Sequence, residues 1–167
     1  RFISEIKQRV FSNTEPKFQV RALFEAFDTI DKLVKENGRI NRKELKILKR
    51  LNTPKKIQDF INEMVFDASG DAAAFSPMSI LERKACQCVE GAALAALALR
   101  VNGYPPLIVD LTANKDDLDH VVAVFKKDGK WGAISKTNHA VLRYREPVYN
   151  SIRELAMSYF HEYFDNK

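Results

Sequence analysis

The sequence predicts an α+β protein, with N-terminal helices, a central cysteine-bearing helix packed on an antiparallel sheet of about three or more strands, and a C-terminal helix. Apolar side chains recur at helical spacing over the first third of the chain, and an Ala- and Leu-rich run without proline follows Cys88. After Gly103 the apolar period shortens to two around an Asp128-Gly129 pair, which is typical of strands joined by a tight turn.

The composition is that of a soluble globular protein. The chain has 167 residues, of which 46% are hydrophobic and 29% charged, enough for one substantial core. The net charge is +5, but acidic residues lie among the basic ones, so nucleic acid is not expected as a partner. No apolar run approaches the roughly 18 residues of a membrane helix, so we expect no membrane contact and a cytoplasmic location. Because the chain opens at Arg1, a targeting segment could have been trimmed from it.

The two cysteines, Cys86 and Cys88, do not predict a disulfide, because a single intervening residue would strain one. With three scattered histidines they do not supply a usual zinc ligand set either. The segment Gly38–Glu44 matches half of an EF-hand loop, but Leu33 and Lys35 stand where oxygen ligands are needed. We therefore expect no metal and no other cofactor.

Helical spacing predicts three helices before the core, over residues 1–12, 18–37 and 41–51. Asn41 can cap the third of these, and Glu44 three residues later fits a capping box. Residues 1–52 are assigned to an N-terminal helical region and residues 53–167 to the core, and we expect the two to form one compact unit.

The core begins with a helix at Thr53-Pro54, where proline suits the first helical position. Residues 67–79 are rich in Asp, Ser, Gly and Ala and predict a surface loop, followed by a short apolar turn and the cysteine helix. Three strands and an extended segment are then expected, over residues 105–112, 120–125, 131–135 and 141–147. A last helix is predicted over residues 151–164.

The cysteine helix predicts thiol chemistry. Cys88 lies in the first turn, where unpaired backbone N–H groups and the helix dipole favour an anion and lower a thiol pKa. Cys86 precedes it by two residues, about 200° round a helix, and is expected to face away. His120 opens a strand and could take the thiol proton as a general base. The alternative is that Cys88 is a buried packing thiol and His120 a structural residue.

Five segments resemble the transglutaminase-like superfamily of papain-related cysteine enzymes. They are Cys88-Val-Glu-Gly-Ala92, Leu99-Arg-Val-Asn-Gly-Tyr-Pro105, Leu107-Ile-Val-Asp-Leu111, Asp119-His120-Val-Val and Lys130-Trp131-Gly-Ala-Ile-Ser135. The later segments Leu142–Tyr149 and Arg153–Phe160 resemble a bacterial branch of this superfamily that has no assigned substrate. The resemblance covers about residues 54–136, roughly half of the chain.

The resemblance implies Cys88 as the nucleophile and His120 as its base. The aspartate of the family falls on Ser135, which can accept a hydrogen bond but cannot stabilise an imidazolium as a carboxylate would. Asn138 lies three residues later and could supply a Cys-His-Asn arrangement like that of papain.

Three further residues are candidates for substrate contacts. Gln87 could help an oxyanion hole together with the Cys88 N–H. Glu90 favours the helix dipole, or pairs with an arginine such as Arg143 or Arg145. Trp131 is expected in the core or in a pocket wall.

Two functions follow from these residues. The first is a cysteine-dependent acyl-transfer or amide-hydrolysing enzyme acting on a protein, peptide or small amide, with Asn138 or Ser135 orienting His120. The alternative is a non-catalytic binding module that keeps the fold, which the missing aspartate favours.

Overall fold

The computed structural model describes residues 9–10, 19–22, 40–69, 75–113, 118–160 and 162. Within them, six strands form one antiparallel sheet in the order β1-β2-β5-β6-β7-β8. These strands are β1 Arg9–Val10, β2 Gln19–Ala22, β5 Leu107–Thr112, β6 His120–Lys127, β7 Lys130–Ser135 and β8 Arg145–Tyr149. A separate parallel pair joins β3 (Val65–Phe66) to β4 (Ala85–Cys86).

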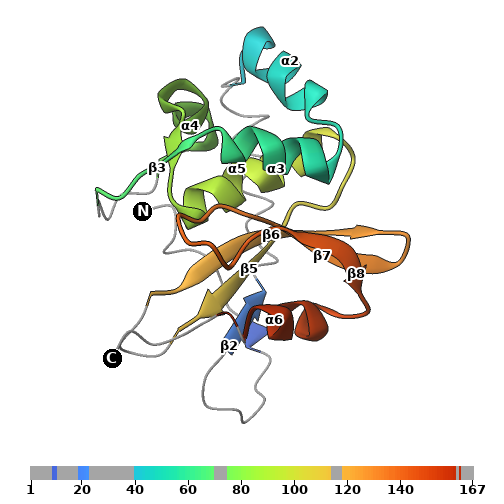
Figure 1. The fold of residues 1–167 in the computed structure, drawn as a ribbon. Coiled ribbons are helices and arrows are strands. Elements are labelled where there is room, and N and C mark those ends of the chain that lie inside the picture. Colours follow the sequence, from blue (N-terminus) through green and yellow to red (C-terminus); the bar gives the residue numbers. More distant parts are fainter. Residues whose placement is uncertain are drawn as a thin grey trace.

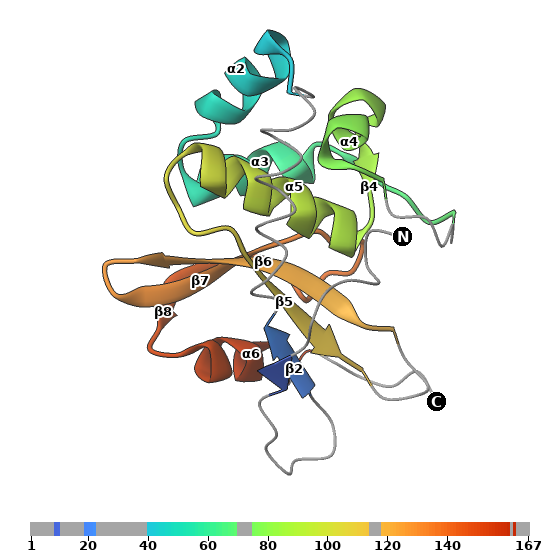
Figure 2. The same cartoon turned by 180° about the vertical axis from the view of Figure 1, so that it is seen from behind.

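Helices cover both faces of the large sheet (Figures 1 and 2). On one side, α3 Pro54–Asn62 and α5 Cys88–Val101 contact the sheet, and α2 Arg42–Arg50 and α4 Pro77–Arg83 pack on α5. The other face carries α6 (Ile152–Phe160). The predicted α+β class is confirmed, with the cysteine-bearing helix packed on an antiparallel sheet and a helix at the C-terminal end.

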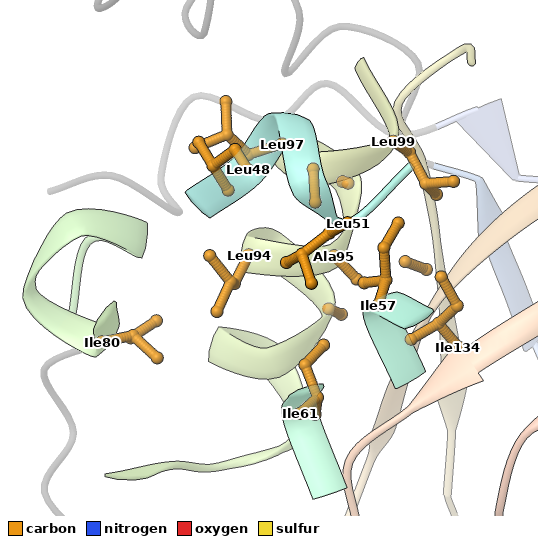
Figure 3. Packing of buried hydrophobic residues seen from close by; sticks show 14 of the residues in the cluster. Leu48, Leu51, Ile57, Ile61, Ile80, Leu94, Ala95, Leu97, Leu99 and Ile134 are labelled. Atoms are coloured by element: carbon orange, nitrogen blue, oxygen red, sulfur yellow. The ribbon is translucent and has the colours of Figure 1, made fainter. Parts of the chain in front are cut away.

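The first core, which we name the α5 cluster, is built around α5 because its many alanines and leucines let neighbouring helices and the sheet approach closely. Leu48 of α2, Ile57 and Ile61 of α3 and Ile134 of β7 converge on it (Figure 3). Since Leu48 and Leu51 belong to this cluster, residues on both sides of the predicted boundary at 52/53 share one core.

The second core, the α6 cluster, lies on the opposite face of the sheet. It joins Val122 and Val124 of β6 to Leu155 and Tyr159 of α6. Along β6 the intervening residues Val121, Ala123 and Phe125 belong to or pack against the α5 cluster instead, as the two-residue period of a strand requires. The parity of a residue on β6 therefore decides which helix it faces.

The helix starts follow from local capping. Asn41 Oδ1 accepts from the N–H groups of Lys43 and Glu44, while Glu44 accepts from the Asn41 N–H, so the predicted capping box is confirmed. Thr53 caps α3 through the Lys56 N–H, and Pro54 occupies the first turn as predicted.

The loop predicted over residues 67–79 is wrong at its end. Ser76 accepts from the Ser79 N–H and Pro77 takes the first helical position, so α4 begins inside the predicted loop. Pro77 starts a helix here, although it suggested a break. Residues 70–74 lie outside the described part of the chain.

The N-terminal helices predicted over residues 1–12 and 18–37 are wrong where the structure describes them. Arg9–Val10 and Gln19–Ala22 are strands, and β2 pairs with β5 from Gln19↔Thr112 to Ala22↔Val109. The physical reason is that β2 satisfies backbone groups along one edge of β5. The rest of both segments lies outside the described residues.

The strands after Gly103 agree closely with those predicted from the sequence. Asp128 and Gly129 both have positive φ, 50° and 78°, as the expected hairpin geometry requires. The extended segment predicted over 141–147 instead contributes β8, which begins at Arg145 and ends at Tyr149. Helix α6 lies inside its predicted range of 151–164, of which residues 161, 163 and 164 are not described.

Candidate functional site

Cys88 is the first residue of α5, as predicted. The start of the helix is fixed by Glu90, whose Oε2 accepts from the Gln87 N–H at 2.8 Å and whose Oε1 accepts from the Phe75 N–H at 2.8 Å. Glu90 is buried, so it serves as a structural cap that ties residue 75 to α5.

The alternative of a Glu90–arginine pair is wrong. Arg145 pairs with Glu162 across 2.5 Å, and Arg143 Nε donates to the Ala140 carbonyl at 3.1 Å. Both arginines lie with α6 and the segment before β8, whereas Glu90 lies in the first turn of α5.

The Cys88 thiol lies against the backbone at the start of β6. Its Sγ is 4.0 Å from the carbonyl oxygen of Asp119, and the N–H of Val121 contacts it as well. Burial raises the pKa of the Cys88 thiol, and the nearby carboxylate of Asp110 raises it further. The N–H groups of Val121 and Val89 oppose this rise without cancelling it, so the thiol stays protonated at neutral pH.

The His120 imidazole belongs to the other face of the sheet. His120 has the parity of Val122 and Val124, and its ring meets that of Tyr159 edge-on at a centroid distance of 6.4 Å. It is almost fully buried beneath α6. Burial lowers the pKa of His120 to about 4, so the imidazole is neutral at pH 7.

Ser135 is the partner of this imidazole. His120 Nε2 lies 2.8 Å from Ser135 Oγ, and that hydroxyl donates to the Leu142 carbonyl at 2.5 Å. Since the single hydroxyl proton goes to Leu142, Ser135 accepts from His120, which assigns the proton of the neutral ring to Nε2. Of the two residues predicted to orient His120, the structure brings Ser135 into contact.

The thiol and the imidazole are thus separated by the strand that carries His120. Cys88 reaches the peptide backbone on either side of His120 from the α5 face, while the ring projects toward α6. Within the described residues, no hydrogen bond joins the Cys88 sulfur to the ring. The structure therefore brings together His120 and Ser135, and places Cys88 beside the backbone of Asp119 and Val121, the two neighbours of His120.

The remaining predicted residues lie apart. Asn138 is exposed in the loop after β7, and none of the described hydrogen bonds links it to His120. Trp131 pairs with Lys126, six residues along β6 from His120, and packs against the α6 cluster. Gln87 is half-buried at the position that precedes α5, beside Cys88.

Cys86 is fully buried, 3.8 Å from the sulfur of Met64, and burial raises the pKa of its thiol to about 11. Cys86 is a packing residue, whereas Cys88 is partly exposed, and the choice of Cys88 over Cys86 as the nucleophile stays a prediction. Within the described ranges, no group of three or more His, Cys, Asp or Glu side chains could hold a metal ion. None of the described helices is long and apolar enough to span a bilayer.

Two residues that hold the site together were missed by sequence reasoning. Gln58 of α3 donates to the Ser135 carbonyl and accepts from the Ser135 N–H, both at 2.8 Å. The Lys136 ammonium is buried and donates to the carbonyls of Ile61, at 3.1 Å, and Met64, at 2.5 Å. Gln58 directly follows the inward-facing Ile57, and a polar side chain at that place in an amphipathic helix was the available signal.

The comparisons with known proteins leave the family open. No protein-family model matches the chain, and no curated protein matches it at a significant level.

Proposed function

We propose that this chain is a non-catalytic binding module built on a transglutaminase-like arrangement of a cysteine helix and a sheet. The observation that carries the proposal is the position of the His120 imidazole, buried on the face of the sheet opposite α5 and hydrogen-bonded to Ser135. A thiol nucleophile needs its base within hydrogen-bond reach, whereas the described contacts of Cys88 are to the Asp119 carbonyl and the Val121 N–H.

Electrostatics supports the same proposal. A thiolate–imidazolium pair needs a lowered thiol pKa and a raised histidine pKa, whereas burial raises the pKa of Cys88 and lowers the pKa of His120 to about 4. Ser135 adds no negative charge, and its hydroxyl already donates a hydrogen bond to the Leu142 carbonyl. The Leu142 carbonyl favours the imidazolium but does not cancel the effect of burial, and among the described residues no carboxylate contacts the ring as in a triad.

The second candidate is a cysteine-dependent acyl-transfer or amide-hydrolysing enzyme. It is favoured by the partly exposed Cys88 at a helix start, with the N–H groups of Val89 and Val121 against its sulfur. Such donors stabilise a thiolate or an oxyanion. This function would require the His120 ring to reach the α5 face.

The experiment is alkylation of Cys88 by iodoacetamide as a function of pH, followed by mass spectrometry, in the native chain and in His120→Ala. The proposed module predicts a thiol pKa at or above the ordinary value of about 8.5, equal in both proteins. A pKa near or below 7 that rises in His120→Ala would favour the enzyme. Cys88→Ser is the labelling control, because buried Cys86 should react only on unfolding.

A further inference from the structure

Helix α2 concentrates the positive charge of the chain. Residues 42–50 carry five basic side chains and one acidic one, a net charge of +4 against +5 for the whole chain. All five basic residues are exposed, and none of them forms an ion pair with another described residue. The acid, Glu44, is held in the capping box with Asn41. Among the described residues, no acidic side chain neutralises the basic charge of α2, which makes this helix a candidate surface for an anionic partner.

Four of these cations surround a shallow, open depression on one side of α2, which is lined by α2 alone and which we name the α2 groove. Arg42, Lys46, Lys49 and Arg50 recur at helical spacing on one side of α2, and Leu45 lies among them with 36% of its surface exposed. The buried Leu48 packs into the α5 cluster near Leu97, which fixes the rotation of the helix and keeps the groove outward (Figure 3). In both overall views α2 lies at the end of the molecule remote from the sheet (Figures 1 and 2).

The side chains around the groove favour one kind of anionic partner over the others. Leu45 and Ile47 are two residues apart, about 200° round the helix, so α2 has no continuous apolar face for a membrane surface. Residues 42–50 contain no aromatic side chain on which a nucleic acid base could stack. A phosphate backbone would also leave the apolar floor at Leu45 unused, whereas an acidic peptide with an apolar side chain would fill it.

We propose that the α2 groove binds an acidic segment of a partner protein, with carboxylates on the four cations and an apolar side chain on Leu45. This inference rests on the proposed binding function, for which it names the surface and the class of partner. The groove uses none of the residues of the thiol site. Experiments can therefore reject peptide binding by α2 and the non-catalytic role of Cys88 separately.

The test is fluorescence anisotropy of the full chain with a labelled peptide of repeating Glu-Glu-Leu units. The variant Arg42→Gln/Lys46→Gln/Lys49→Gln should weaken binding by roughly tenfold or more. Leu45→Ser should weaken it several-fold without changing any charge. The matched control is Lys126→Gln/Lys127→Gln/Lys130→Gln, which removes three positive charges from the exposed β6–β7 hairpin and should leave binding unchanged.

Three outcomes would overturn the inference. They are equal loss of binding in the hairpin control, no loss in Leu45→Ser, and tighter binding of duplex DNA or of phosphatidylserine vesicles than of the peptide. All substitutions lie at exposed positions, and circular dichroism checks that each variant is folded. If Cys88 proved to be activated while the peptide still required α2, the non-catalytic function would fail and the groove would stand. An inert Cys88 with no peptide binding would reject the groove alone.

Discussion

His120 Nε2 lies 2.8 Å from Ser135 Oγ, and both side chains occupy the face of the sheet that α6 covers. The register explains the contact, because Ser135 pairs with Val122, two residues from His120 and on the same face of β6. The Ser135 hydroxyl suits a neutral imidazole, because it accepts a hydrogen bond from the ring and donates its own hydrogen bond to the Leu142 carbonyl. The pair is complete as a buried neutral network.

The stability of the fold should depend on His120 in a defined pH window. The unfolded imidazole binds a proton below pH 6.5, whereas the folded one does so only below about 4. The unfolded state therefore binds more protons between these values, and up to about 3 kcal/mol of unfolding free energy is lost as the pH falls through the window. Urea unfolding of the native chain at pH 7, 5.5 and 4 measures this loss.

His120→Gln is the matched variant for that measurement, because glutamine keeps an N–H donor for Ser135 and does not titrate. Its stability should fall less than that of the native chain between pH 6.5 and 4. The acidic groups with lowered pKa values, such as Glu154, remain in both proteins and cancel in the difference. Equal slopes in the two proteins would mean that His120 is not buried in its neutral form.

Ser135→Ala should cost about 1–3 kcal/mol of unfolding free energy. The substitution leaves the His120 N–H and the Leu142 carbonyl without the hydroxyl between them in a buried site. Urea unfolding measures the loss, and Ser69→Ala, at an exposed position, should change stability by less than about 0.5 kcal/mol. Equal, small effects in both variants would reject the network.

Ser135→Asp places a carboxylate at the position where the resemblance to transglutaminase-like enzymes implies one. The charge should raise the pKa of His120 by at least about one unit, because an adjacent carboxylate favours the imidazolium. NMR titration of the ring protons measures this shift. The pKa of Cys88, measured by alkylation, should stay unchanged, since the added charge faces α6. A lowered thiol pKa in this variant would show that the two groups communicate.

Gly91→Ala should destabilise the protein by about 1–3 kcal/mol. An added Cβ would lie 2.7 Å from Lys136 Cβ and 3.6 Å from Cys86 Sγ. Lys136 has little freedom to withdraw, because its buried ammonium is held by the carbonyls of Ile61 and Met64. Gly103→Ala is the comparison, since its Cβ meets no atom within 4 Å and any cost comes from its φ of 85°. Urea unfolding separates packing from backbone strain.

The parts of the fold with a strong local signal could be predicted from the sequence. The Ala- and Leu-rich run favours a helix over any other secondary structure. The Asp128-Gly129 pair permits the positive φ values of the turn and so sets the register of β6 and β7. The helix start at Pro77 was missed because proline begins helices as readily as it interrupts them. The strand at 19–22 was missed because its pairing with β5 is a long-range contact.

The site could be predicted only in part for a related reason. Strand β6 is apolar on both faces, so its alternation does not tell which set of residues meets α5. The superfamily resemblance implied that Ser135 or Asn138 orients His120, and the structure places Ser135 in contact with the ring. The sequence does not reveal that the His120 ring lies on the face of the sheet opposite Cys88. That depends on which face of the sheet each helix covers.

The central claim, that Cys88 and His120 do not titrate as a pair, is tested most directly by the pKa of His120 before and after alkylation of Cys88. NMR titration of the full chain gives both values. Because coupling between two ionisable groups is reciprocal, an uncoupled ring should keep its pKa near 4 in both forms. A pKa near or above 7 that falls by more than about one unit on alkylation would contradict the account and identify a thiolate–imidazolium pair.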